Sequence, residues 1–177
     1  MSSTLVAASD LSALSARDED GALRVVVESP AGSRVKLKYD PTLGAFTISR
    51  PLVLGVVYPF DWGFVPGTRG PDGDPIDVIL VSDFSTYPGV VIPAHALAVI
   101  RVEQNAKSGG GRQRNDRIVA EPAPARRRSG PLSERVRKEL EHFFTATTVF
   151  EGKDLALLGW GSADEAEALV DEARRDA

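Results

Sequence analysis

The chain has 177 residues, no cysteine, 42% hydrophobic residues and a formal net charge of −4. This length suits one domain with a buried core, and the lack of cysteine excludes disulfides and thiolate metal sites. The mild negative charge argues against a dedicated nucleic-acid binder, and no apolar run approaches the roughly eighteen residues that a membrane span needs.

The first 21 residues are rich in Ser, Ala and acidic side chains. They lack the basic start and apolar core of a secretory signal, so we expect a cytoplasmic protein with no membrane partner. Their composition predicts a flexible N-terminal arm over residues 1–21. Residues 22–177 are then expected to form a single domain.

Short strands are predicted by β-branched runs, by alternation of apolar and polar residues, and by Gly, Pro and Asp between them. The predicted strands cover residues 23–28, 35–39, 45–48, 52–57, 76–81, 90–102 with a break near Pro93, and 117–120. So many short strands at close spacing indicate a small barrel or sandwich.

Two helices are predicted after the strands. Leu132, Val136, Leu140 and Phe144 recur at helical spacing with charges between them. Residues 162–165 read Ser-Ala-Asp-Glu, which has the form of a capping box, and an apolar stripe follows as far as residue 173. Strands first and helices last indicate an α+β fold that is mainly β.

Three aspartates lie within six residues at the start of a predicted strand. In an extended chain Asp72 and Asp74 point to the same face, and the bend at Pro75 can direct Asp77 to the same space. Converging carboxylates repel one another unless cations neutralise them, and hard oxygen ligands suit Mg²⁺ or Mn²⁺. An Asp-Gly turn with solvated acids is the alternative, which this pattern by itself leaves open.

Other metal sites fit the chain poorly. A calcium loop would need an oxygen ligand where Ile76 stands and a glycine where Asp77 stands. Zinc is disfavoured because His95 and His142 are isolated and no cysteine is present.

A basic stretch follows the sixth predicted strand. It contains Arg112, Arg114, Arg117 and the run Arg126, Arg127 and Arg128. These side chains form either a solvated loop rim or a positive lip over an anionic ligand, and clustering alone does not separate the two.

The segment Asp-Gly-Asp-Pro-Ile-Asp-Val at residues 72–78 resembles the signature of the family I soluble inorganic pyrophosphatases. Residues 58–68, Tyr-Pro-Phe-Asp-Trp-Gly-Phe-Val-Pro-Gly-Thr, are similar to the family's Tyr-Pro-x-x-Tyr-Gly-Phe-Ile-Pro stretch at the same distance upstream. Further matches in order are 27–30, Lys36, Arg50, 87–89, 115–120, 142–144 and 159–160. The resemblance therefore extends from about residue 23 to the end of the chain.

This resemblance implies a small five-stranded, OB-like barrel with flanking helices, in a homo-oligomer that is usually a hexamer. It implies hydrolysis of pyrophosphate to two orthophosphates by water that Mg²⁺ activates, with Mn²⁺ as a possible substitute. The implied site residues are Asp74 as the proton acceptor, Lys36, Arg50 and Tyr58 as phosphate ligands, and Asp72, Asp77, Glu28 (through metal-bound water) and Asn115 as the metal site.

Several positions depart from the family pattern. Lys38 stands where the family has an acid, Trp62 replaces a tyrosine, and Asn115 replaces an aspartate. The remaining departures are Arg117 for a lysine, Thr147 and Thr148 for a Tyr-Lys pair, and Glu103 for a second loop aspartate. A catalytically weak or inactive relative that binds pyrophosphate or a nucleotide phosphate is therefore the alternative, and an OB-type nucleic-acid binder ranks last because exposed stacking aromatics are few.

Overall fold

The computed structural model describes residues 10–106, 109–123 and 131–174. Its strands are β1 (Leu23–Ser29), β2 (Val35–Asp40), β3 (Ala45–Pro51), β4 (Asp61–Val65), β5 (Ile76–Leu80), β6 (Val91–Asn105), β7 (Arg112–Arg114), β8 (Arg117–Pro122) and β9 (Ala156–Gly161). Its helices are the 3-10 turn η1 (Leu11–Ala13) and the α-helices α1 (Glu134–Thr148) and α2 (Ala163–Ala173).

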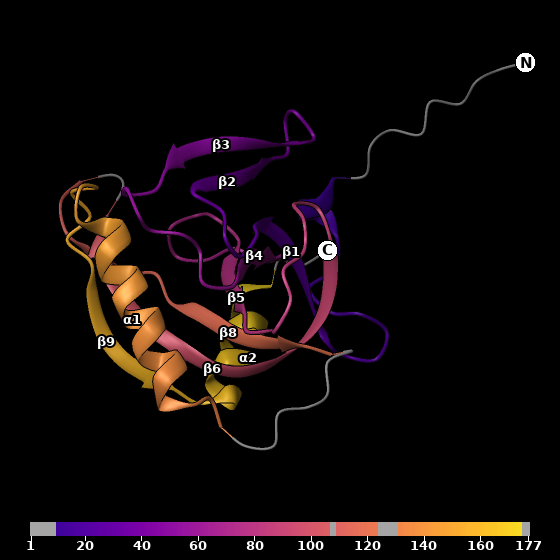
Figure 1. The fold of residues 1–177 in the computed structure, drawn as a ribbon. Helices are drawn as coiled ribbons and strands as arrows, with labels where there is room; N and C mark the ends of the chain where they lie inside the picture. The colour runs from indigo at the N-terminus through magenta and orange to yellow at the C-terminus, as the bar shows by residue number, and fades with distance from the viewer. Residues whose placement is uncertain (1–9, 107–108, 124–130, 175–177) are drawn as a thin grey trace, which may run out of the picture.

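Within these described residues, five strands pair in a closed ring. The order is β1-β4-β5-β8-β6 and back to β1, with every neighbour antiparallel except β5 and β8. Strands β7 and β9 pair with the far half of β6, and β2 and β3 form a separate hairpin above the ring (Figure 1). The expected α+β fold with an OB-like, five-stranded barrel is confirmed.

The two α-helices of the described chain pack against different apolar clusters. Helix α2 contributes Ala166 and Val170 to a cluster with side chains from β1, β5 and β8. Helix α1 contributes Leu140, Phe143 and Phe144 to a second cluster, which also contains Tyr58 and Trp62. The aromatic rings of this second cluster form the floor on which the candidate site rests.

Both helix predictions are confirmed, and the second one in atomic detail. The Ser162 hydroxyl accepts a hydrogen bond from the Glu165 amide, and the Glu165 carboxylate accepts one from the Ser162 amide. This reciprocal capping box starts α2 where the sequence placed it. No helix in the described ranges is long and apolar enough to cross a membrane.

The strand predicted over residues 52–57 is wrong. The Val56 amide donates to the Val53 carbonyl across a turn, and Gly55 has a φ of 86°, which a strand residue does not adopt. The apolar residues of this run do not share one environment. Leu52 is buried and anchors the turn in the core, whereas Leu54 is 99% exposed. Strands β4, β7 and β9 were not predicted.

Strand β6 is not broken at Pro93. It runs through the proline, whose carbonyl still accepts the Ala123 amide at 2.7 Å. The register instead shifts between Ala96 and Ala98, where a bulge lets one long strand bend around the ring.

The structure describes only residues 10–21 of the expected N-terminal arm, because residues 1–9 lie outside the described ranges. From Asp10 onwards the chain packs on the domain instead of extending from it. Ala16 is buried in the α2 cluster, and the Leu11 amide donates to the Tyr39 hydroxyl at 3.2 Å. Arg17 forms ion pairs with Glu167 and Asp171 of α2 at 2.7 and 3.0 Å.

Candidate functional site

The site lies where the β2–β3 hairpin faces one mouth of the ring. Two adjoining cavities share Asp77, which projects from β5. The first, of about 250 Å³, is lined by Glu28, Lys38 and Asp74 among others, and we call it the acidic cavity. The second, of about 40 Å³, is the basic cavity, whose charged and phenolic lining besides Asp77 is Lys36, Arg50, Tyr58, Arg117, Glu151 and Lys153.

Glu28 at the end of β1 is the most deeply buried acid of the acidic cavity, with 6% of its surface exposed. Burial raises the pKa of its carboxyl to about 7, and the negative charge of Asp77 adds to this effect. The Tyr39 amide donates to Glu28 Oε1 at 2.8 Å and opposes the shift. Glu28 is thus held in place by the neighbouring β2 strand.

Asp74 is paired with a lysine. Its Oδ2 lies 2.8 Å from Lys38 Nζ, and both side chains are about two-fifths exposed, at 39% and 40%. Burial lowers the pKa of Lys38, but the hydrogen bond with Asp74 and the surrounding acids outweigh burial and raise it. Lys38 is therefore a permanent cation at this position.

Asp72 is directed toward a different part of the chain. Its Oδ1 accepts the Asp74 amide at 3.2 Å, and its Oδ2 accepts the Asn115 side-chain amide at 3.1 Å. Asn115 therefore uses its N–H, and not its oxygen, toward Asp72. The structure brings Asp74 and Asp77 to one cavity and places Asp72 beside Asn115.

The basic cavity contains a lysine whose charge is perturbed. Burial lowers the pKa of Lys36 to about 8, while the Asp77 carboxylate favours the charged form. The nearby cations Lys153 and Arg117 lower it further. Lys36 thus loses its proton more easily than an ordinary lysine.

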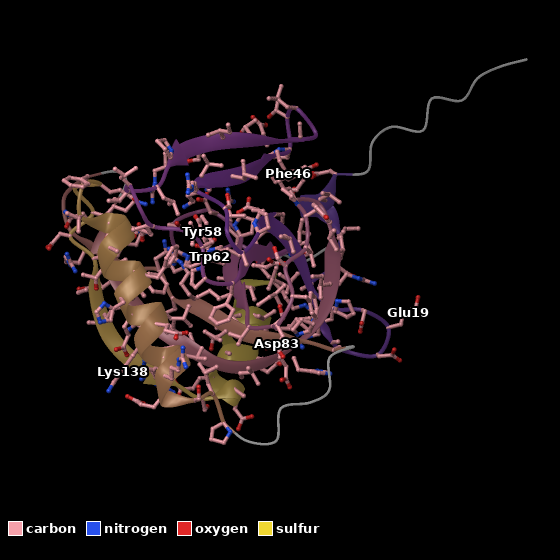
Figure 2. The ribbon with its side chains drawn as sticks, viewed as in Figure 1. Glu19, Phe46, Tyr58, Trp62, Asp83 and Lys138 are labelled. Atoms are coloured by element: carbon pink, nitrogen blue, oxygen red, sulfur yellow. The ribbon has the colours of Figure 1, made fainter. Side chains whose placement is uncertain are left out.

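Tyr58 and Arg50 lie beside Lys36. Tyr58 is 4% exposed, and burial raises its pKa to about 12, so its hydroxyl stays protonated at neutral pH. It packs edge-on against Trp62 at 5.7 Å between ring centres, and Figure 2 shows the two rings in the middle of the molecule. Arg50 forms an ion pair with Glu151, which also lies 2.6 Å from Lys153 Nζ.

Arg117 at the start of β8 is the most buried cation among the described site residues, with 7% of its surface exposed. Its Nε lies 2.8 Å from Asp77 Oδ2 without hydrogen-bond geometry, and its Nη1 donates to the Asn115 carbonyl. A buried guanidinium beside a carboxylate supplies a fixed positive charge at the boundary of the two cavities.

The second loop aspartate of the family was matched to Glu103, but the structure places Gln104 in the basic cavity instead. Gln104 is 4% exposed and follows the buried Val102 on the same face of β6. Glu103 faces outward and pairs with Arg112 at 3.1 Å. Because the predicted strand stopped at residue 102, its alternation was not carried on to Gln104.

Asp116 does not replace Asn115 in the site. Its Oδ1 accepts the Val102 amide at 2.9 Å, and Arg114 pairs with its Oδ2 at 2.6 Å. Arg112 is held by Glu103 and by Asp154 at 2.8 Å. These pairs favour the loop-rim interpretation for Arg112 and Arg114, while Arg126, Arg127 and Arg128 lie outside the described residues.

Thr147 and Thr148, which replace the family's Tyr-Lys pair, line the basic cavity, but their hydroxyls point to the backbone of α1. Thr147 donates to the Phe143 carbonyl and Thr148 to the Phe144 carbonyl, both at 2.9 Å. Lys153 and Glu151, which sequence reasoning did not select, line the same cavity just beyond α1. The signal that could have indicated them is their place in the chain, because they directly follow the helix segment in which the family has its Tyr-Lys pair.

A family model described as inorganic pyrophosphatase matches residues 25–177. The chain belongs to the inorganic pyrophosphatase family. An inorganic pyrophosphatase of Leifsonia xyli is 37% identical over 82% of this chain and 90% of its own length, and one of Synechocystis is 33% identical over 92% and 96%. The crystal structure of the inorganic pyrophosphatase from Thermus thermophilus has a TM-score of 0.84, with 29% identity over 93% of this chain and 97% of the other.

Members of this family generally use a divalent metal, and the acidic cavity can be tested for one. Glu28, Asp74 and Asp77 offer oxygen donors on one cavity, and the repulsion that helps raise the pKa of Glu28 is one that a cation would relieve. The donor chemistry therefore fits. As arranged, however, no group of three or more His, Asp or Glu side chains in the described ranges is gathered to hold an ion.

Replacing Glu28 by Gln is expected to stabilise the metal-free protein at pH 8 and not at pH 4. Because of the raised pKa, the carboxyl of Glu28 ionises only above about pH 7 in the folded protein, whereas it ionises near pH 4.5 in the unfolded chain. Above pH 7 the folded protein therefore contains a buried negative charge, which costs stability. The penalty is fully present above pH 7, shrinks as the pH falls from 7 to 4.5, is absent below 4.5, and amounts to roughly 3 kcal/mol. Urea unfolding of both proteins in EDTA measures it, and an equal gain at both pH values would contradict the assignment.

Proposed function

We propose that this protein hydrolyses inorganic pyrophosphate to two orthophosphates with Mg²⁺, for which Mn²⁺ can substitute. The observation that carries the proposal is the pairing of an acidic and a basic cavity around Asp77, in a chain that matches the family over residues 25–177. The first can hold cations and a water molecule, and the second offers fixed positive charges to phosphate oxygens.

The basic cavity would hold the phosphates. Lys36, Arg50 and Arg117 would balance the charge on the transferring group and on the orthophosphate that leaves. The Tyr58 hydroxyl, protonated because of its high pKa, would donate a hydrogen bond to the same oxygens. The buried rings of Trp62 and Phe143 line this end of the site and would exclude water from the bound phosphates.

The acidic cavity would supply the nucleophile. Asp74 lines it with a partly exposed carboxylate and would accept the proton of the attacking water. Asp72, Asp77, Glu28 and Asn115 are the proposed residues of the metal site. A bound Mg²⁺ would neutralise the negative charges of substrate and protein and lower the pKa of water.

The direct test is phosphate release. Purified protein with Mg²⁺ and pyrophosphate should release two orthophosphates per substrate molecule, and EDTA should stop the reaction. Asp74→Asn serves as the inactive control. Equal inactivity of the native chain and this variant would overturn the proposal, and pyrophosphate binding without turnover would identify the inactive binding relative instead.

Above about pH 8 the specificity constant kcat/KM is expected to fall, by about tenfold per pH unit. The reason is that Lys36, with its pKa lowered to about 8, loses the charge that faces the phosphate. Lys36→Arg should move this fall to higher pH because a guanidinium stays protonated. The measurement is kcat/KM from pH 7 to 10 for the native chain and Lys36→Arg, with Lys138→Arg on the outer face of α1 as control; coincident profiles for all three would exclude Lys36.

A homo-oligomer, as a hexamer, and a cytoplasmic location belong to the same proposal. Family resemblance supports the oligomer, and so does an apolar surface at the turn before β4, where Leu54 is 99% and Val57 is 42% exposed. Light scattering during size-exclusion chromatography measures the mass directly. A monomer at micromolar concentration would contradict the hexamer.

A further inference from the structure

We propose that the Lys38 ammonium is a built-in cation of the acidic cavity, which occupies the place of one divalent ion. The native chain then binds one divalent ion fewer than the same chain with a carboxylate at position 38. This inference rests on the proposed function for its meaning, but it concerns cation binding and can be tested without any substrate.

The hairpin directs Lys38 into the cavity. Lys36 and Lys38 are two residues apart on β2, so their side chains leave the same face of the strand. Lys36 lines the basic cavity, while Lys38 lines the acidic cavity and reaches Asp74 at 2.8 Å. The alternation of the strand thus delivers one cation to each half of the site.

The surroundings of Lys38 are those of a bound cation. Asp74 contacts it directly, and the charges of Asp77 and Glu28 act on it as well. These three are the carboxylates among the described residues that line the acidic cavity. An ammonium in the middle of such a set competes for the position that a metal ion would take.

Other N–H groups of the chain also compensate the acids. Arg117 lies against Asp77, and the Asn115 amide donates to Asp72. Every aspartate of the 72–77 segment therefore has a nitrogen partner from outside that segment. Lys38 and Asn115 both stand where the resembling family has an acid, but Asn115 is neutral and only Lys38 brings a positive charge, so Lys38 changes the charge of the cavity most.

The difference in charge between lysine and glutamate at position 38 corresponds to one bound divalent ion. Lys to Glu at position 38 changes the charge of the cavity by two units, from +1 to −1, which equals the charge of one divalent cation. The same exchange also replaces three hydrogen-bond donors by two oxygen ligands. A carboxylate here would leave four acids facing one another unless an ion entered.

The test is a titration of metal-free protein with Mn²⁺. Electron paramagnetic resonance measures the concentration of the free ion, and calorimetry measures the affinity. Lys38→Glu should bind one more Mn²⁺ per chain than the native protein. Lys38→Met, which only removes the ammonium, should tighten the weakest native site at least tenfold. Circular dichroism checks that each variant is folded, and Lys38→Met keeps the test informative if Lys38→Glu does not fold.

The matched control is Lys138→Glu, which makes the same change of net charge on the exposed face of α1 (Figure 2). It should bind Mn²⁺ like the native chain. Equal stoichiometry and affinity in the native chain and both Lys38 variants would overturn the inference, as would an equal gain in Lys138→Glu. The titration contains no pyrophosphate, so its outcome does not depend on activity. A native chain that does not hydrolyse pyrophosphate would overturn the proposed function but leave the inference about Lys38 intact. An active native chain would not save that inference if the Mn²⁺ titrations contradict it.

Discussion

Replacing Asp74 by Asn is expected to lower the rate of phosphate release by about 10²–10⁴-fold while the fold is kept. The amide has the shape of the carboxylate but cannot accept a proton from water. Its oxygen can still accept the hydrogen bond from Lys38 that Asp74 accepts now at 2.8 Å. Since both partners of that ion pair are about two-fifths exposed, its loss should change the free energy of unfolding by less than about 1 kcal/mol.

Three measurements separate a catalytic from a structural effect. The kcat of the variant should fall, its urea midpoint should stay close to that of the native protein, and Asp83→Asn should leave both unchanged. Asp83 is an exposed aspartate on the loop after β5 and undergoes the same chemical exchange (Figure 2). A variant that keeps more than a tenth of native kcat would remove Asp74 from the role of proton acceptor.

The largest effect on stability is expected from Gly63→Ala. Gly63 on β4 is paired with Val27 of β1, and a Cβ there would lie 2.0 Å from the Val26 carbonyl oxygen. Val26 and Val27 are fully buried, so the two backbones cannot separate without opening the ring. We expect the free energy of unfolding to fall by roughly 3 kcal/mol or more.

The control for this substitution is Gly44→Ala in the turn between β2 and β3. Gly44 has a φ of +60° and no atom within 4 Å of the added carbon, so it should cost only about 1–2 kcal/mol of backbone strain. Urea unfolding of the three proteins gives both differences. Similar losses for the two variants would mean that the close approach of β1 and β4 is not what requires a glycine at 63.

The same contact links the fold to the site. The register between β1 and β4 shifts between Val27 and Ser29, the stretch in which Glu28 stands. A displaced β1 would move this carboxylate relative to Asp77 on β5. We therefore interpret Gly63 as a residue whose close contact with β1 helps to fix the position of Glu28 relative to Asp77.

The sequence by itself determined the features that depend on neighbours in the chain. The capping box at Ser162, the helical spacing from Leu132 to Phe144 and the alternation of residues 35–39 all act over a few residues. The order and spacing of the motifs around Asp72, Asp74 and Asp77 were sufficient to predict the family and the α+β barrel. These signals survive because they are local or because they recur in one order along the chain.

Only the tertiary structure decided which donors meet which acids. Lys38 and Asp74 are 36 residues apart, and Asn115 and Asp72 are 43 residues apart, so their contacts depend on how the hairpin and the ring pack. The choice of Gln104 over Glu103 likewise depends on how far β6 continues beyond the predicted strand. Side-chain direction follows from pairing and register, which are set by ring closure between distant strands, and no short stretch of sequence encodes that closure.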